Sequence, residues 1–410
     1  MEQFTIQRLG HQGDGIADGP VFAPRTLPGE VVSGILDGKV LTDIRIDTPS
    51  DDRVKPPCPH YKSCGGCGLQ HASDAFVAGF KVDVVRHALA AQGIEAAFRQ
   101  IQTSAPQTRR RATLTARRTK KGVLVGSHAR ASDTITEIPN CHLLTPEVLA
   151  ARPAIADLAM AGASRKGALA VTLTQSDAGL DVLVRGGKDL DGPLQITLAG
   201  IADRHDLARL TWEGEVIVTR QTPAQQFGTA HVTPPPGAFL QATQDGEAQL
   251  LSAVTEATKG ASRIIDLFAG CGTFSLPLAQ TAEVHAVEGD RAMTEALDKG
   301  WRHASGLKRV TVEARDLFRN PIIAEDLTGF DAAVIDPPRA GAEAQTEHLA
   351  AAQIPRIAFV SCNPVTFARD AKTLIQAGYR LDWVQVVDQF RWSAHVELAA
   401  SFTLSHMAND

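Results

Sequence analysis

The stretch RIIDLFAGCGTFS, residues 263–275, decides the fold of the second half of this 410-residue chain. Within it, Asp266, Gly270 and Gly272 form the pattern D-x-x-x-G-x-G before a predicted helix. Glycines at such a turn let the backbone approach a ligand where a side chain would clash. Glu288 ends the next apolar run, where a carboxylate can accept hydrogen bonds from ribose hydroxyls. The stretch therefore predicts a nucleotide-type site at the end of a strand.

The glycine pattern is incomplete at its third position. A pyrophosphate-binding turn reads G-x-G-x-x-G, and Ser275 stands where the third glycine belongs. A cofactor without a pyrophosphate is therefore favoured over NAD, and S-adenosylmethionine (SAM) meets that description. An ordinary strand-to-helix turn is the alternative, and the motifs further along the chain disfavour it.

Apolar runs alternate with helical stretches from this point to the C-terminus. Such an order is typical of a parallel sheet with helices on both faces, and two final strands are expected to form a hairpin that closes it. The runs are RIIDLF, EVHAVEG, RVTVEARD, DAAVID and RIAFVSC, and the final pair is YRLDWVQVVDQF and HVELAASFTL. We assign residues 239–410 to a Rossmann-like α/β domain.

The chain before residue 239 has a different texture. Residues 1–50 hold short alternating runs with frequent turns, which predict a small β-barrel. Residues 51–71 are rich in Pro, Gly and Cys, and residues 72–92 have the periodicity of a helix that could pack on the C-terminal domain. Further β-rich runs complete a central domain, which we assign to residues 51–238.

Composition limits the class of protein. Hydrophobic residues make up 44% of the chain, which suits packed cores, and no stretch reaches the roughly 18 apolar residues of a membrane span. The N-terminus lacks the basic-then-apolar pattern of a signal peptide, so a cytoplasmic location is expected. A net charge of −5 gives no general nucleic-acid signal but allows a local basic patch.

Two further motifs follow predicted strand ends. Asp336 opens the segment DPPR, and Cys362 lies in the turn SCNP. Ligands of open α/β sheets sit beyond the carboxyl ends of the strands, so both side chains are expected to face one cleft. A small buried residue is the plain alternative for Cys362, but its place in this turn favours a nucleophile. Amino-group methyltransferases also carry D-P-P, usually followed by an aromatic residue, where this chain has Arg339.

These motifs together resemble the uracil-5 RNA methyltransferases, the family that makes 5-methyluridine in tRNA and 23S rRNA. The shared segments keep the family's order across the C-terminal half: FLQAT (239–243), DLFAGCGTFSLPLA (266–279), DPPRAG (336–341), VSCNPVTFARD (360–370) and HVE (395–397). The resemblance implies Cys362 as nucleophile and Glu397 as general base. It implies a SAM site lined by Gln241, Phe268, Thr273, Glu288, Asp316 and Asp336. Thr273 replaces an expected Asn, and Arg391 stands where the family usually has Pro.

The reaction that the resemblance implies explains the two catalytic residue types. Uracil C5 is a poor nucleophile toward a methyl group, and addition of a thiolate at C6 makes an enolate that is nucleophilic at C5. C5 then attacks the sulfonium methyl of SAM, a base removes the C5 proton, and the thiolate leaves. Cys362 must therefore ionise, Glu397 must reach the C5 proton, and the uracil must leave its stack. The plain alternative, a solvated Glu397, is disfavoured inside a buried hairpin.

Four more cysteines lie upstream of the predicted α/β domain. Cys58, Cys64 and Cys67 give C-x5-C-x2-C, and Cys141 follows in IPNCHLL. This spacing fits zinc knuckles poorly, although nearby histidines keep zinc open. Four thiolates suit an iron–sulfur cluster, and the resemblance implies a [4Fe-4S] cluster on this pattern in the rRNA-modifying branch. We expect the cluster to be structural, and Cys271 to be a packing residue.

The basic segment 109–130 is the candidate RNA contact. It holds Arg109, Arg110, Arg111, Arg117, Arg118, Lys120, Lys121 and Arg130. A solvated hairpin face usually explains such a run, but in an otherwise acidic chain this density favours phosphate contacts. The first strands resemble a TRAM domain, an OB-like barrel that binds RNA in this family. We expect a monomeric enzyme that methylates 23S rRNA, with a tRNA enzyme and a non-catalytic iron–sulfur RNA-binding protein as alternatives.

Overall fold

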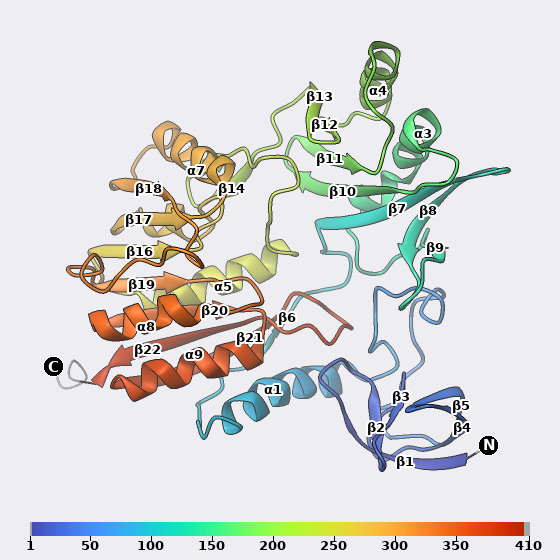
Figure 1. The fold of residues 1–410 in the computed structure, drawn as a ribbon, viewed down its shortest axis with the longest axis horizontal. Helices are drawn as coiled ribbons and strands as arrows, with labels where there is room; N and C mark the ends of the chain where they lie inside the picture. Colours follow the sequence, from blue (N-terminus) through green and yellow to red (C-terminus); the bar gives the residue numbers. More distant parts are fainter. Residues whose placement is uncertain (1, 406–410) are drawn as a thin grey trace.

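The computed structural model describes residues 2–405 of the chain. Figure 1 shows three β-structures in chain order: a barrel at the N-terminus, a central sheet, and a larger sheet sandwiched by helices at the C-terminus. No helix within residues 2–405 is both long enough and apolar enough to cross a membrane.

The N-terminal barrel contains five short strands in the order β1-β2-β3-β5-β4 and is closed. They are β1 (Glu2–Leu9), β2 (Gly15–Ala17), β3 (Val21–Ala23), β4 (Val31–Asp37) and β5 (Val40–Thr48). Ile6, Val32 and Leu41 fill its small core. A Cβ at Gly34 would lie 2.7 Å from Leu41 Cγ, so the barrel wall needs a glycine there. The barrel expected for residues 1–50 is confirmed.

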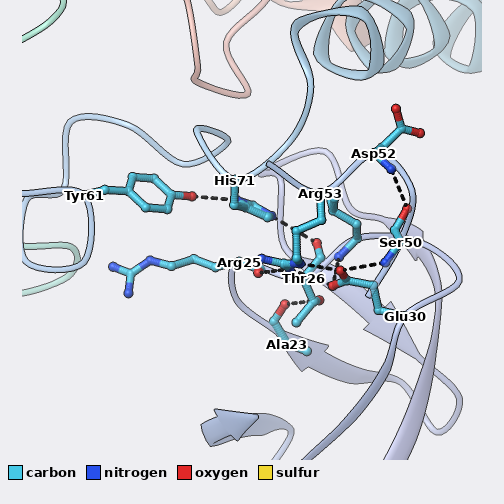
Figure 2. A network of polar contacts seen from close by, with 10 residues as sticks. Ala23, Arg25, Thr26, Glu30, Ser50, Asp52, Arg53, Tyr61 and His71 are labelled. Carbon is cyan, nitrogen blue, oxygen red and sulfur yellow. Dashed lines mark hydrogen bonds and ion pairs between the residues drawn. The ribbon is translucent and has the colours of Figure 1, made fainter. Parts of the chain in front are cut away.

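Figure 2 shows how the segment after the barrel is fixed to it. Arg53 pairs with the fully buried side chain of Glu30 and donates to Arg25 O at 2.9 Å. Further along, the Tyr61 hydroxyl lies 2.6 Å from His71 Nδ1. Burial lowers the pKa of His71 to about 4, so this histidine is neutral in the fold. These contacts order a stretch that is too poor in apolar residues to build a core.

The central domain is a seven-stranded sheet in the order β13-β12-β11-β10-β7-β8-β9. Its strands are β7 (Arg111–Thr119), β8 (Gly122–His128), β9 (Ile135–Glu137), β10 (Leu169–Ser176), β11 (Gly179–Arg185), β12 (Arg209–Trp212) and β13 (Glu215–Thr219). Helices α2 (Pro146–Ala150), α3 (Arg152–Gly162) and α4 (Gly192–Arg204) accompany it, and a hairpin of β14 (Gln225–Phe227) and β15 (Ala230–Val232) follows. Trp212 is fully buried and anchors the core.

The C-terminal sheet has eight strands in the order β18-β17-β16-β19-β20-β22-β21-β6. Its strands are β6 (Gln102–Thr103), β16 (Arg263–Leu267), β17 (Glu283–Glu288), β18 (Val310–Ala314), β19 (Ala332–Ile335), β20 (Arg356–Ser361), β21 (Tyr379–Asp388) and β22 (Leu398–Leu404). Its helices are α5 (Gln244–Ala257), α6 (Ser275–Leu278), α7 (Arg291–His303), α8 (Glu343–Ala352) and α9 (Pro364–Gln376). Ile264 packs in one core and Ile265 in the other, as a sheet buried on both faces requires.

Two upstream elements complete this C-terminal sheet. Helix α1 (Asp74–Ala90) begins at Ser73, whose hydroxyl accepts from Phe76 N, and its residues Val85 and Leu89 join the core that α8 and α9 cover. Strand β6 pairs in parallel with β21, with Gln102 opposite Val387. Residues 74–103 therefore pack with the C-terminal domain rather than with the central sheet beside which they lie in sequence.

Candidate active site

The turn after β16 has the backbone that its glycines predict. Gly270 and Gly272 have φ angles of 56° and 92°, in the left-handed region that favours glycine. A Cβ at Gly272 would lie 2.8 Å from Leu297 Cγ. Phe268 also has a positive φ of 63°, which is costly for an aromatic residue and is typical of functional turns. The backbone at this turn is therefore held close to the space beyond the strands.

Two carboxyl groups fix the turn. Glu288, at the end of β17, accepts from Gly270 N and from Asp290 N, each at 2.9 Å. Asp266 is fully buried and accepts from the Ser275 hydroxyl at 2.5 Å, which gives the residue at the third glycine position a role. Burial raises the pKa of Asp266 to about 7, and Asp266 Oδ1 has no hydrogen-bond partner. An unpartnered buried acceptor beside a glycine turn suits a polar ligand.

Two further predicted cofactor residues, Asp316 and Thr273, lie at the same edge of the sheet. Asp316 follows β18, is exposed, and accepts from Phe318 N at 3.0 Å. The ring of Phe318 is half exposed and lies 5.4 Å from that of Phe268, so two aromatic faces border the turn. Thr273 is half-buried within the turn. These features fit a molecule with an apolar ring and polar ribose hydroxyls, as SAM has.

The candidate nucleophile and base lie at the same end of two neighbouring strands. β20 and β22 are antiparallel, with Ser361 opposite Leu398. Cys362 follows Ser361, and Glu397 precedes Leu398. The two residues therefore lie next to each other, directly beyond this last pair of the two strands. Burial first, then the charges of Glu397 and Asp336, raise the pKa of Cys362 to about 11. Asp336 follows β19, which pairs in parallel with β20, so the thiol and both carboxyl groups lie at one edge of the sheet.

Glu397 is a buried acid with few compensating charges. Its side chain is 3% exposed, and burial raises its pKa well above the usual range, with a further contribution from Asp336. A hydrogen bond from Gln389 and the charge of Arg339 oppose that shift. Arg339 is itself exposed, with Nη2 3.2 Å from His395 Nδ1. An acid, a thiol and a guanidinium group at this edge of the sheet therefore influence one another's protonation.

Gln389 is a site residue that the sequence analysis missed. Its side chain is buried, with Nε2 2.5 Å from Gln241 Oε1 and 3.3 Å from Glu397 Oε2. Gln241, predicted from FLQAT, is thereby joined to the candidate base. One signal in the sequence could have indicated it. Gln389 lies in DQF, directly after the buried end of β21, where an amide without hydrogen-bond partners would be costly.

The loop that carries Glu397 is fixed by residues far away in sequence. Arg391 pairs with Asp74 and donates to Ser104 O at 3.1 Å, so the arginine that replaces an expected proline has a structural role. Trp392 O accepts from both Gly68 N and Leu69 N at 2.9 Å. The loop that carries the candidate base is therefore held by the cysteine-rich segment and by the start of α1.

The four upstream cysteines gather at one place. All are free and partly buried, and the pKa of Cys67 is raised to about 12, first by burial and then by Cys141, Cys64 and Cys58. Backbone amides donate to two of the sulfurs, Gly66 N to Cys64 at 3.4 Å and Leu143 N to Cys141 at 3.5 Å. Four thiolates suit an iron–sulfur group when their sulfurs converge on one point. No set of three or more His, Cys, Asp or Glu in residues 2–405 is arranged to hold a metal ion, so the [4Fe-4S] cluster stays a prediction.

The basic segment 109–130 is not one continuous surface, which corrects the expectation for part of it. Arg110 is buried and pairs with Glu247 at 2.6 Å, because its main chain joins the strand-like segment before α5. Arg130 pairs with Asp14 of the barrel through two bonds. Lys120 and Lys121, at the tip of the β7–β8 hairpin, are exposed.

Cys271 is buried in the core, as expected for a packing residue.

Several known proteins resemble this chain in sequence. Residues 302–404 match the family model described as tRNA (Uracil-5-)-methyltransferase. The chain is 45% identical over 406 residues to an RNA methyltransferase of Rhizobium meliloti, covering 97% of this chain and 98% of that protein. It is 33% identical over 425 residues to the 23S rRNA (uracil(1939)-C(5))-methyltransferase RlmD of Shewanella halifaxensis, covering 98% and 95%.

A solved structure shares the fold over the whole chain. It is the Pyrococcus abyssi tRNA (uracil-54, C5)-methyltransferase in complex with S-adenosyl-L-homocysteine. The TM-score is 0.75 at 22% identity, covering 98% of this chain and 99% of that one. The likeness confirms the predicted Rossmann-like class of the C-terminal domain.

Proposed function

This chain belongs to the uracil-C5 RNA methyltransferase family, and on that premise we propose that it methylates C5 of a uridine in 23S rRNA through Cys362 and Glu397. The observation that carries the proposal is the strand register that brings these two residues together, with Ser361 opposite Leu398. A buried acid beside a cysteine at the carboxyl edge of the sheet is the pair that the reaction needs.

The proposed steps use Cys362 as the nucleophile and Glu397 as the base. The Cys362 sulfur forms a bond to uracil C6, and the electron pair of the C5–C6 double bond moves toward O4. SAM, when bound, would supply an electrophilic methyl group to C5, and S-adenosylhomocysteine would leave with the electron pair of the broken sulfur–methyl bond. Glu397 then takes the C5 proton, the double bond re-forms, and the C6–sulfur bond breaks to return the thiolate. Glu397 holds this proton and passes it to solvent before the next cycle.

The charges in the cleft set the starting protonation states. Burial and two carboxyl neighbours hold Cys362 as a thiol in the free protein, and Arg339 is the group that opposes them. A cation bound beside Asp336 would offset one of these negative charges and favour the thiolate. The cofactor is such a cation, so its binding and the activation of Cys362 are expected to be linked.

The cofactor residues are assigned in the same way. We assign Gln241, Phe268, Thr273, Glu288, Asp316 and Asp336 to the SAM site, because all lie around the glycine turn or the carboxyl edge of the sheet. Glu288 would serve the ribose, and the rings of Phe268 and Phe318 would contact the adenine.

We also assign Cys58, Cys64, Cys67 and Cys141 to a [4Fe-4S] cluster that stabilises the cysteine-rich segment. The proposed domains are 1–50, 51–238 and 239–410, with α1 and β6 counted with the last. The barrel and the exposed Lys120 and Lys121 are the proposed RNA contacts of a cytoplasmic, monomeric enzyme.

The 23S rRNA substrate is favoured by the named rRNA-modifying relative and by the cysteine pattern. A tRNA substrate is the second candidate, because the similar solved structure is that of a tRNA enzyme. The test is methylation of unmodified 23S rRNA and tRNA transcripts with labelled SAM, followed by nucleoside mass spectrometry. We expect 5-methyluridine in the rRNA. Label in tRNA alone would overturn the substrate, and no 5-methyluridine in either RNA would overturn the function.

A further inference from the structure

We propose that Gln389 is a positioning residue that aims the Glu397 carboxylate at the C5 proton and favours its ionised form for that step. The inference deepens the proposed function and rests on it. Gln389 lies directly after β21, between the two residues that the family motifs place in the cofactor and base positions, Gln241 and Glu397.

The hydrogen bonds determine which way the Gln389 amide points. Its Oε1 accepts from the main-chain amide of Ala242 at 2.7 Å, and a backbone N–H can only donate. The carbonyl end therefore faces Ala242, and the NH2 end faces the cleft. A flipped amide would place its NH2 group against the N–H of Ala242 and its single carbonyl oxygen against Gln241 Oε1 and Glu397 Oε2. The contact network thus fixes the orientation that makes Gln389 a donor to the base.

The two hydrogens of Gln389 Nε2 have separate partners. One goes to Gln241 Oε1 and the other to Glu397 Oε2, so both donors are used when the carboxylate is ionised. The main chain supports the same arrangement, because Val387 N donates to Glu397 O at 2.8 Å. Gln389 therefore contacts the base through its side chain while the adjoining backbone holds the base's own main chain.

Packing leaves the Gln389 side chain little freedom. It is 2% exposed, and a Cβ at Gly246, in the first turn of α5, would lie 2.8 Å from Gln389 Cβ. Helix α5 therefore lies directly against the residue. A side chain held by its neighbours can orient a partner at little entropic cost during the reaction.

Glu397 needs such a donor because of its surroundings. The charged and titratable groups that face it are Asp336, Cys362 and Arg339, and burial favours its neutral form. Among the described residues, Gln389 is the side chain that hydrogen-bonds its carboxylate. A neutral Glu397 cannot accept the C5 proton, so loss of this donor is expected to demand a higher pH for turnover.

The test compares two reactions of Gln389→Met and of a matched control. Gln345→Met removes another buried glutamine, whose amide is satisfied by Ile322 N and O on α8's side of the sheet. The first reaction is turnover on uridine RNA as a function of pH. The second is formation of the covalent adduct on 5-fluorouridine RNA, which needs cysteine addition and methyl transfer but cannot proceed through loss of a C5 proton.

We expect Gln389→Met to lower turnover roughly tenfold and to move the acidic limb of its pH profile upward, because the base is less readily ionised. Adduct formation should stay within about twofold of the wild type, as should both reactions of Gln345→Met. Equal slowing of turnover and adduct formation, or an unchanged pH profile, would overturn the proposal.

A separate measurement on Gln389→Met tests whether the loss of its contact with Gln241 weakens cofactor binding. Affinity for S-adenosylhomocysteine, measured by calorimetry, should change by less than about threefold, because Arg110 still donates to the main-chain oxygen of Gln241. A larger loss of affinity with an unchanged pH profile would assign Gln389 to cofactor binding instead. Failure of the proposed function itself is distinguishable, since the wild type would then form no 5-methyluridine.

Discussion

Lys81 on α1 and Asp388 at the end of β21 form an ion pair whose side chains are 0% and 1% exposed. Lys81 Nζ also donates to Phe390 O at 3.0 Å, in the loop that leads to Glu397. We predict that Lys81→Met lowers the free energy of unfolding by about 3–5 kcal/mol, because Asp388 is left as an uncompensated buried charge. Urea unfolding followed by circular dichroism measures this loss.

The control for that ion pair is the double variant Lys81→Met with Asp388→Leu. Replacing both charges with apolar groups removes the uncompensated carboxylate, so most of the lost stability should return. If the double variant is as unstable as the single one, packing rather than charge accounts for the loss.

The proposed covalent role of Cys362 can be tested directly. Wild-type protein, SAM and RNA with 5-fluorouridine at the target site should give an adduct that survives denaturing electrophoresis, because fluorine cannot leave as a proton. Cys362→Ala should give none, while its affinity for S-adenosylhomocysteine shows that the fold is intact. An adduct formed by Cys362→Ala would exclude Cys362 as the nucleophile.

Removal of the base should trap the intermediate on ordinary RNA. Glu397→Gln keeps the shape of the side chain but cannot accept the C5 proton, so turnover should fall roughly 10²–10⁴-fold. Methyl-labelled RNA should then accumulate in covalent complex with the protein. Slow turnover without such a complex would indicate that Glu397 acts before methyl transfer.

The buried Asp266 should make the free energy of unfolding depend on pH. Burial raises its pKa from 3.8 to about 7, so the folded protein binds a proton that the unfolded chain releases between these values. Its contribution to stability is present below pH 4 and is lost as the pH rises to about 7. Asp266→Asn should therefore reduce the fall in stability between pH 5 and 8 by on the order of 3 kcal/mol. Urea unfolding at both pH values checks the sign, and an equal fall in both proteins would contradict it.

The cysteine site predicts a change in the catalytic loop. Gly68 and Leu69 follow Cys67 and donate to Trp392 O. Cys67→Ser should abolish bound iron and acid-labile sulfide in anaerobic preparations and accelerate hydrogen exchange at these two amides. Wild-type protein that contains zinc and lacks iron would refute the [4Fe-4S] assignment.

Local patterns predicted the parts of the molecule that depend on local geometry. Glycines with positive φ, such as Gly270 and Gly272, are required by the backbone of one turn, and residues at strand ends share an edge by the rules of parallel sheets. Asp266, Asp336 and Cys362 were therefore placed at the carboxyl edge from sequence. The barrel followed from the period-two alternation of its strands.

Contacts between residues far apart in the sequence could not be predicted in the same way. Strand β6 is two residues long, and its place in the C-terminal sheet depends on β21, which lies far along the chain. Arg110 was assigned to RNA because a run of cations resembles a surface, and its buried partner Glu247 lies 137 residues away. Whether a cationic residue is free to contact RNA or is buried in the fold depends on its partners in space. A single sequence does not show which residues those partners are.

The separation between Lys81 and Asp388 also bears on how the chain is made. The two residues are 307 positions apart, so at roughly 5–20 residues per second about 15–60 s of synthesis pass between them. During that time α1 has neither its ion-pair partner nor helix α9 and strand β21, the elements against which it packs. Its apolar residues Val85 and Leu89 therefore stay uncovered until the last part of the chain has been made.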